Sequence, residues 1–328
     1  MSAITPAEAL SKVSLLTCKG YNPNFILASK KINITSILNN DQKKELPFVE
    51  GNEKGILNYT DLSVLFNKNR KIPFFSAYNI DGSNKVENVK RTTFRVDQRI
   101  DASIQLNKSF YDLEKKFTEF EIGYMAANNE MAWGSEAQLK AYQTFLYTNS
   151  VPQAENLNTG VWKSLETYII KEAINDAENK KINVITGPVL NVNDPVYVND
   201  NNFQVPLQFF KIIIFEFNTK LYATAFIMSH EKKLREDELI IDKVVQKKAA
   251  FKIEQPFMDF LYSKVYQVNV EEISKLTGMK FKWAGVKNIP IENKSNLIKI
   301  SKQKTNQSKS ALKSKIVEVK RSNIILPK

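Results

Sequence analysis

The sequence predicts an α+β protein with a basic C-terminal tail. Strand-like and helix-like segments occur in mixed order along the chain, which is typical of this fold class. The 328 residues are 43% hydrophobic, enough for a buried core, and only 10 glycines interrupt the chain. The net charge of +12 is concentrated near the C-terminus. We therefore expect an N-terminal helix in residues 1–19, one domain over residues 20–284, and an extended or disordered basic tail over residues 285–328.

Capping signals and helical periodicity indicate where helices lie. Thr5 to Glu8 match a capping box with Pro6 at the first helical position, which predicts a short helix from residue 6 to about residue 17. Two further helices are expected, at Glu136–Tyr142 and from Thr159 to about Glu178. The second has an apolar face made of Trp162, Leu165, Ile169 and Ala173.

Apolar runs rich in β-branched and aromatic residues indicate the strands. They predict strands at residues 72–78, 144–147, 182–186, 209–217 and 221–227. The last two runs are separated by Asn218, Thr219 and Lys220, so we expect them to form a hairpin.

The basic tail carries most of the net charge. Residues 285–328 hold 11 Lys and Arg but only the acids Glu292 and Glu318, which leaves nine of the twelve net positive charges there. Residues 302–315 are almost entirely polar and cannot bury enough surface to fold alone. The tail is therefore either an arm that binds nucleic acid phosphates or an acidic partner, or a linker that ends in a short docking strand at Ile316–Val319 or Ile324–Leu326.

The single cysteine and the single histidine restrict the chemistry. Cys18 alone cannot form an intramolecular disulfide or a Cys-rich zinc site, and His230 alone excludes a metal site built from several histidines. No stretch approaches the roughly 20 apolar residues that cross a bilayer, and the N-terminus lacks a signal-peptide pattern. We expect a cytoplasmic protein without membrane contact. His230 is interpreted as a surface or loop residue, with a catalytic role as the alternative.

A motif in the middle of the chain carries chemistry. The pattern is Thr-Phe, a strand, Asn-x-x-Pro-Gln, and then Asn-x-x-x-Trp-x-x-Leu-Glu. Its fixed positions are Thr144-Phe145, Asn149, Pro152-Gln153, Asn158, Trp162 and Leu165-Glu166. This pattern resembles the central signature of the DNA/RNA non-specific endonuclease family, of the ββα-metal or His-Me finger type.

Flanking segments extend the resemblance over residues 20–283. They are Gly20–Phe25, Tyr78–Gly82, Asp97–Ile100, Trp133-Gly134, Thr186–Val189, Val205-Pro206 and Val268–Gly278. The resemblance implies a mixed, largely antiparallel central sheet flanked by helices, with a ββα-metal core. It leaves the tail unexplained, and it implies a homodimer because the family commonly forms one.

The resemblance also implies a metal site. It assigns Asn158 to Mg²⁺ or Mn²⁺ through its side-chain carbonyl, since a hard dication keeps most of its waters and accepts one or two protein oxygens. Glu166 follows eight residues later, within about 80° around the helix, and is expected to hold a metal-bound water. Asn149 is expected to orient the base or the phosphate. Asn158 also suits a helix N-cap, and one residue can serve both purposes.

The sequence departs from the family at the catalytic motif. The family's Asp-Arg-Gly-His aligns with Glu121-Ile122-Gly123-Tyr124, so Ile122 replaces the phosphate-binding Arg and Tyr124 replaces the His that activates water. Basic residues that follow the His in one branch are replaced by Ala126-Ala127.

Tyr124 is a poor substitute for a histidine base. A phenol with a pKa of about 10 is ionised in roughly one molecule in a thousand at pH 7, and a general base usually contributes about 10² to 10⁴ in rate. The alternative is an aromatic side chain that fills the space of the missing His. The three tryptophans are expected in the core and not as base-stacking surfaces; they are Trp133, Trp162 and Trp283.

Three hypotheses follow for the function. The first is a nuclease-fold protein that has lost most of its hydrolysis and binds nucleic acid or a protein partner. The second is an active Mg²⁺-dependent DNA or RNA endonuclease with a rearranged base, in which Tyr124, Asn149 and Glu166 are catalytic. The third is an assembly protein that docks through its basic tail, favoured by the near-neutral domain. The sequence leaves open whether the protein is an enzyme.

Overall fold

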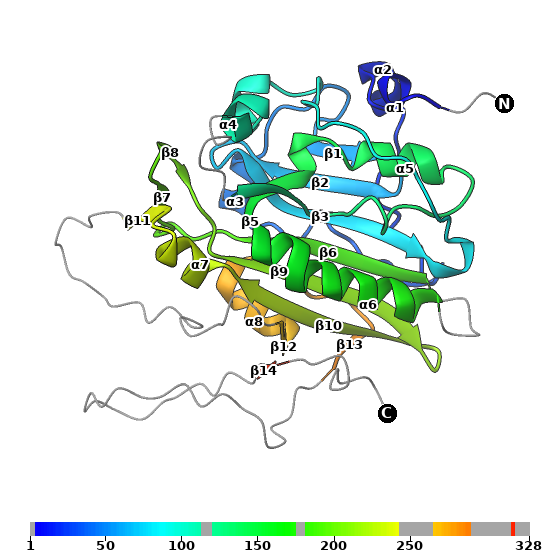
Figure 1. The fold of residues 1–328 in the computed structure, drawn as a ribbon. Helices are drawn as coiled ribbons and strands as arrows, with labels where there is room; N and C mark the ends of the chain where they lie inside the picture. The colour runs from blue at the N-terminus through cyan, green and yellow to red at the C-terminus, as the bar shows by residue number, and fades with distance from the viewer. Residues whose placement is uncertain (1–3, 113–119, 175–180, 243–264, 290–315, 319–328) are drawn as a thin grey trace, which may run out of the picture.

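A nine-stranded sheet forms the centre of the part of the chain that the computed structural model describes, which is residues 4–112, 120–174, 181–242, 265–289 and 316–318. The strand order is β1-β2-β3-β6-β9-β10-β12-β14, and β13 also pairs with β10 (Figure 1). All pairs are antiparallel except β10 with β13. The strands are β1 (Ile56–Tyr59), β2 (Leu62–Asn67), β3 (Ile72–Asp81), β6 (Lys181–Val189), β9 (Gln208–Phe217), β10 (Lys220–Ser229), β12 (Tyr266–Val268), β13 (Val286–Asn288) and β14 (Ile316–Glu318).

Two small sheets and short helices surround the central sheet. One small sheet has β4 and β5, and the other has the order β11-β7-β8. Their strands are β4 (Phe120–Tyr124), β5 (Ser150–Ala154), β7 (Val196–Tyr197), β8 (Asp200–Gln204) and β11 (Ile240–Ile241). The helices are α1 (Pro6–Ala9), α2 (Lys12–Leu16), α3 (Asn40–Lys44), α4 (Lys108–Asp112), α5 (Ala137–Gln143), α6 (Lys163–Ile174), α7 (Glu231–Glu236) and α8 (Val270–Thr277). Single turns are η1 (Gly82–Asn84), η2 (Ala102–Ile104), η3 (Tyr147–Asn149) and the π-helical η4 (Asn156–Trp162). The predicted α+β class is confirmed.

The central strands are buried on both faces, which explains why they were visible as continuous apolar runs. In β9, Phe210 and Ile212 pack into a core on one face, while Phe209 and Ile213 pack into a second core on the other. Such double burial favours a run of apolar residues over an alternating pattern. The predicted strands at 72–78, 182–186, 209–217 and 221–227 are confirmed within β3, β6, β9 and β10. Lys211 of β9 shares the face of Phe209 and is fully buried.

The predicted hairpin is confirmed between β9 and β10. Phe217 pairs with Lys220, so the loop consists of Asn218 and Thr219. Both loop residues have positive φ, 48° and 61°, as a type I′ turn requires. This turn fits the twist of the two long strands that it joins.

The N-terminal helix is shorter than predicted. The capping box at Thr5 and Glu8 is present, but α1 ends at Ala9. Ser11 then begins α2, since its side chain accepts a hydrogen bond from the backbone N–H of Ser14. A second N-cap thus divides the expected helix into two, and α2 ends at Leu16.

The strand predicted at 144–147 is wrong. Thr144 follows α5 as its C-cap residue, and Leu146 makes only an isolated bridge to Arg95. The strand of this region is β5, which begins at Ser150 directly after the turn η3. The preceding helix, expected at Glu136–Tyr142, is confirmed as α5.

The helix expected from Thr159 begins earlier, at Asn156. Its first seven residues form the π-helical turn η4, and α-helical backbone runs from Lys163 to Ile174. Trp162, Leu165 and Ile169 are buried on the predicted face. The expected end near Glu178 lies outside the described residues. Trp133 and Trp283 are buried as well, which confirms the core placement of all three tryptophans.

Two strands from beyond residue 284 join the central sheet. β13 pairs with β10, and β14 pairs with β12. The docking strand predicted at Ile316–Val319 is therefore confirmed over Ile316–Glu318. The second one, at Ile324–Leu326, and the polar segment 302–315 lie outside the described residues. None of the helices in the described part of the chain combines the length and apolarity needed to cross a membrane.

Candidate functional site

The strand pair β4–β5 and the helix α6 form a ββα unit on one face of the central sheet (Figure 1). In this pair Glu121 lies opposite Gln153, and Tyr124 lies opposite Ser150. The chain leaves β5 and enters η4 and α6 almost at once, so the unit is built from neighbouring segments. Trp162 fixes the helix to the sheet by packing against Phe209, with ring centroids 5.9 Å apart.

Gly123 is required by the side chain that lies over it. A Cβ at this position would stand 2.2 Å from Oε1 of Gln153, which is closer than any real contact allows. Gln153 is fully buried, and neither polar atom of its amide has a hydrogen-bond partner among the described residues. Gly123 of the altered catalytic motif and Gln153 of the central signature thus pack directly against each other.

Asn158 contacts the first residue of the altered motif. Its Nδ2 donates a hydrogen bond of 2.6 Å to Oε2 of Glu121, and both side chains are partly exposed. The N-cap residue here is Glu155 and Asn158 lies within η4, so the interpretation of Asn158 as a helix N-cap is wrong. Asn158 and Glu121 thus place an amide beside a carboxylate, a role for Glu121 that was not predicted from the sequence.

Glu166 faces a buried lysine. Its Oε1 lies 3.7 Å from Nζ of Lys211, and its side chain is 14% exposed. Burial and the nearby Glu130 carboxylate raise the pKa of Glu166 to about 8, although Lys211 acts in the opposite direction. The carboxyl group therefore carries a proton over much of the neutral range.

Lys211 is also bound by two fully buried groups. Its Nζ donates to the Tyr78 hydroxyl at 3.0 Å and to Oε1 of Glu130 at 3.0 Å. Tyr78 in turn donates to Oε2 of Glu130 at 2.7 Å. Buried charges persist when they are paired and hydrogen-bonded, as they are here. Lys211 interrupts the apolar run of β9, but the sequence does not show whether such a lysine is buried, and this cluster was not predicted.

Tyr124 is held by an arginine and by aromatic rings. Its hydroxyl accepts a hydrogen bond of 3.2 Å from Nη2 of Arg91. Its ring packs against Phe94 and Phe145, with centroids 5.0 and 5.3 Å away. Burial raises the pKa of Tyr124 well above its ordinary value, while the Arg91 charge lowers it by less. The phenol is protonated at neutral pH.

The amide of Asn149 bonds within the protein. Its Oδ1 accepts from the Ser76 hydroxyl at 2.9 Å and from the backbone N–H of Ala126 at 3.1 Å. Its Nδ2 donates to the carbonyls of Ala126 and Thr144, at 2.9 and 3.1 Å. The side chain is fully buried and fixes the backbone that follows Tyr124.

With this geometry in view, comparisons with known proteins identify the family. The sequence model of the DNA/RNA non-specific endonuclease family matches residues 44–288. The chain belongs to this family. A chain from the crystal structure of the EndoG/EndoGI complex, which concerns the mechanism of EndoG inhibition, is similar with a TM-score of 0.49 and 18% identity, covering 69% of this chain and 84% of that one. No curated protein matches the sequence.

Two of the residues singled out in the sequence meet in space, and others do not. Asn158 touches Glu121, which the resemblance aligns with the family's Asp. Tyr124, which the resemblance aligns with the family's His, is bonded to Arg91, and Glu166 is paired with Lys211. Asn149 lies beneath the segment that follows Tyr124. The expected residues are therefore close along the ββα unit, but each has a protein partner of its own.

His230 lies in the loop position between β10 and α7, as one part of its interpretation expected, but it is fully buried, so its placement on the surface is wrong. Its Nδ1 accepts a hydrogen bond from the backbone N–H of Ala154 at 3.1 Å, and its Nε2 lies 2.7 Å from the Pro206 carbonyl. These partners require the neutral tautomer with the proton on Nε2. Burial lowers the pKa of His230 to about 4. The imidazole anchors the end of β5 farthest from Tyr124.

The donor set fits a partly hydrated dication at one place. The Asn158 amide and the Glu121 carboxylate lie side by side and offer the oxygen ligands that Mg²⁺ and Mn²⁺ prefer. Described residues contain no cluster of three or more His, Cys, Asp or Glu suited to a metal. The ammonium group of Lys211 lies beside the Glu166 carboxyl group, so Glu166 is poorly placed to bind a metal ion.

Proposed function

We propose that the protein binds nucleic acid on a nuclease scaffold and has lost most of the family's phosphodiester hydrolysis. The observation that carries the proposal is the state of Tyr124, at the position of the family's catalytic His. A general base must release its proton near the working pH. The Tyr124 phenol has a raised pKa and already accepts a hydrogen bond from Arg91, so it does not take a proton from water at neutral pH.

The charge around Glu166 supports the same proposal. According to the family resemblance, Glu166 would hold a metal-bound water. This role requires an ionised carboxylate oriented toward the metal. Here its pKa is raised to about 8, and its oxygen lies beside Lys211. A protonated carboxyl or one paired with an ammonium is a weaker acceptor for that water.

A metal still has a place in the proposal. Asn158 and Glu121 would hold Mg²⁺ or Mn²⁺ through one amide oxygen and one carboxylate oxygen. The metal would act there as a Lewis acid toward a phosphate oxygen. Asn158 and Glu121 would in this way position the nucleic acid backbone next to the ββα unit.

One experiment separates loss of hydrolysis from activity. Plasmid DNA and RNA are incubated with the full chain and Mg²⁺ or Mn²⁺, alongside Asn158→Ala, and Mn²⁺ binding is measured by electron paramagnetic resonance. We expect little cleavage by either protein, and Mn²⁺ binding by the native chain that Asn158→Ala weakens at least tenfold. Rapid cleavage that Asn158→Ala abolishes would overturn the proposal.

An active endonuclease with a rearranged base is the second candidate. Arg91 favours it, because its guanidinium supplies a cation beside Tyr124 where Ile122 leaves none. In this alternative Arg91 would steady the phosphate, and a metal held by Asn158 and Glu121 would supply the activation that a strong base otherwise provides. The cleavage experiment distinguishes the two candidates.

Partners and location extend the proposal. The positive charge of the tail supports binding to nucleic acid phosphates, and an acidic protein is the alternative partner of the tail. β14 pairs with β12 of its own chain, so this strand of the tail docks within the protein itself. A homodimer and a cytoplasmic location remain predictions, which size-exclusion chromatography with light scattering and cell fractionation would test.

A further inference from the structure

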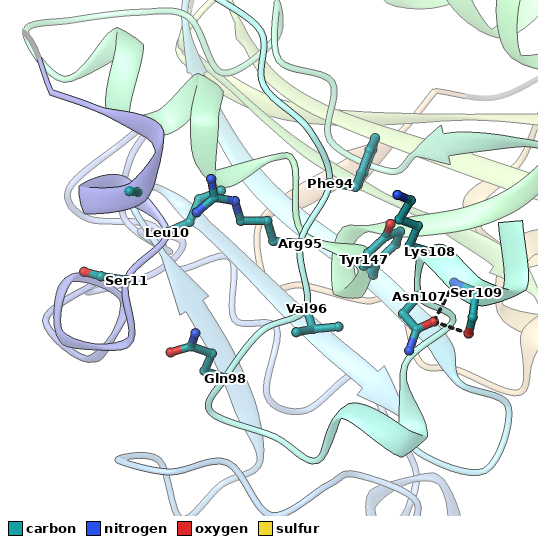
Figure 2. Close-up of a pocket in the computed structure, with 11 residues that line it drawn as sticks. Leu10, Ser11, Phe94, Arg95, Val96, Gln98, Asn107, Lys108, Ser109 and Tyr147 are labelled. Atoms are coloured by element: carbon teal, nitrogen blue, oxygen red, sulfur yellow. Dashed lines mark hydrogen bonds between the residues drawn. The ribbon is translucent and has the colours of Figure 1, made fainter. Parts of the chain in front are cut away.

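Figure 2 shows a pocket of about 680 Å³. It adjoins the ββα unit, because its lining residue Phe94 packs against Tyr124 of β4. It lies between the N-terminal helices, the segment 94–98 and the start of α4. Its volume is within the range of sites that bind small organic ligands. Its lining includes Phe94, Arg95, Gln98, Asn107, Lys108 and Tyr147.

Aromatic rings join this pocket to the altered catalytic position. Phe94 stacks on Tyr147, with centroids 5.6 Å apart and planes 30° apart. The same Phe94 packs against Tyr124 at 5.0 Å. Phe94 is partly exposed, whereas Tyr147 is buried beneath it. One ring therefore contacts both the pocket and the residue in the family's His position.

The polar part of the pocket is positive. Arg95 and Lys108 line it and are exposed, and none of its lining residues is acidic. Figure 2 draws both basic side chains with the amides of Gln98 and Asn107. The backbone of Arg95 is fixed by hydrogen bonds with the backbones of Phe145 and Tyr147, so the segment that carries the cation is ordered.

We propose that this pocket binds one nucleotide of a single-stranded nucleic acid. The neighbouring nucleotides of the strand would then pass over Tyr124 and Arg91. A partly exposed aromatic ring such as that of Phe94 can stack on a nucleobase, and the flanking cations bind the phosphate. Bases in a duplex are already stacked and do not present a free face, so the pocket selects a single strand. This inference rests on the proposed function and specifies which form of nucleic acid is bound.

The test measures binding of fluorescein-labelled eight-nucleotide DNA and RNA by the full chain, by fluorescence anisotropy without metal. We expect Arg95→Gln with Lys108→Gln to weaken binding at least tenfold and to reduce the salt slope by about 1.4, which is 0.7 per lost phosphate contact. The matched control removes Lys280 and Lys282, which are exposed beside the core on the opposite face of the sheet. Lys280→Gln with Lys282→Gln should change affinity less than twofold.

A second pair of variants tests the stacking. Phe94→Leu should weaken binding about fivefold or more, and Phe94→Tyr should retain native affinity. An oligonucleotide with one abasic position should bind the native chain more weakly, and Phe94→Leu should remove that difference. Circular dichroism establishes that each variant is folded.

The outcomes separate this inference from the proposed function. If the native chain binds no nucleic acid, the proposed function and the pocket assignment both fail. If it binds but the pocket variants match the native chain, the function stands and the pocket assignment is overturned. Displacement of the oligonucleotide by micromolar adenosine 5′-monophosphate would also overturn it, because the pocket would then bind a free nucleotide.

Discussion

The ammonium group of Lys211 lies 3.7 Å from Oε1 of Glu166 and 3.0 Å from Oε1 of Glu130. Two carboxyl groups from different parts of the chain thus share one buried cation. Glu166 lies in the first turn of α6, the helix of the ββα unit, and Lys211 belongs to the central sheet, so the pairing also joins the two. A positive charge from the protein itself therefore lies beside the carboxyl group that the family resemblance assigns to holding a metal-bound water.

Removing that cation is predicted to destabilise the fold. Lys211→Met leaves Glu130 without its ammonium partner in a fully buried position, and breaking a buried pair costs about 3 to 5 kcal/mol. Urea denaturation should show this loss. The control is Lys211→Met combined with Glu130→Gln, which removes both charges and should recover part of it. A single variant as stable as the native chain would contradict the pairing.

The pH dependence of stability is predicted to include an alkaline-side loss from Glu166. Its pKa in the folded chain is about 8, above the usual value of 4.5. A raised pKa means that the folded state holds the proton more tightly, so the stabilisation is present below 4.5 and is lost as the pH rises to 8. Compared with Glu166→Gln, the native chain should therefore lose stability between pH 5 and pH 8. Parallel curves for the two proteins would contradict the assignment.

His230 is predicted to act in the opposite direction. Its pKa is about 4 in the folded chain and 6.5 in the unfolded chain, so its contribution is present above pH 6.5 and is lost as the pH falls toward 4. Between pH 7 and pH 5 the loss is about 2 kcal/mol. His230→Gln can keep an acceptor and a donor without titrating, so the native chain should lose this much relative to the variant. Urea denaturation of both proteins at the two pH values measures this difference. If the native chain and His230→Gln lose the same stability, the lowered pKa of His230 is contradicted.

The strands and the ββα unit could be predicted because their signals are local. β9 and β10 are continuous apolar runs with turn residues between them, and burial on both faces demands such runs. The motif from Asn149 to Glu166 spans one strand, one turn and one helix, so its spacing fixed their order. The strand predicted at 144–147 was wrong because a short run such as Thr-Phe-Leu-Tyr suits a buried turn as well as a strand.

The contacts of the site could not be predicted because they join distant segments. Lys211 meets Glu130 across 81 positions of the chain, and His230 meets Ala154 across 76. Arg91 reaches Tyr124 from a segment that carried no recognised motif. A buried lysine or histidine has the same sequence signature as an exposed one, so only the folded structure reveals its partner.

Tyr124 is predicted to have no role as a base. Tyr124→Phe removes the hydroxyl and keeps the ring against Phe94, so any residual cleavage should change less than twofold. Tyr124→His instead places an imidazole at this position and should raise cleavage at least tenfold, since a general base contributes about 10² to 10⁴. Single-turnover assays with Mg²⁺ measure both. A tenfold loss on Tyr124→Phe would show that the phenol is the working base.

The tail is predicted to add a sequence-independent contribution to nucleic acid affinity. Residues 290–315 contain seven lysines, and each lysine that contacts a phosphate adds about 0.9 to the salt slope for duplex DNA. Replacing all seven by glutamine leaves the strands β13 and β14 unchanged and should lower the slope by several units, equally for different sequences. The control replaces seven serines, threonines and asparagines of the same segment by glutamine, which preserves the charge. If the lysine variant binds duplex DNA with the native slope, the tail contacts something other than phosphate.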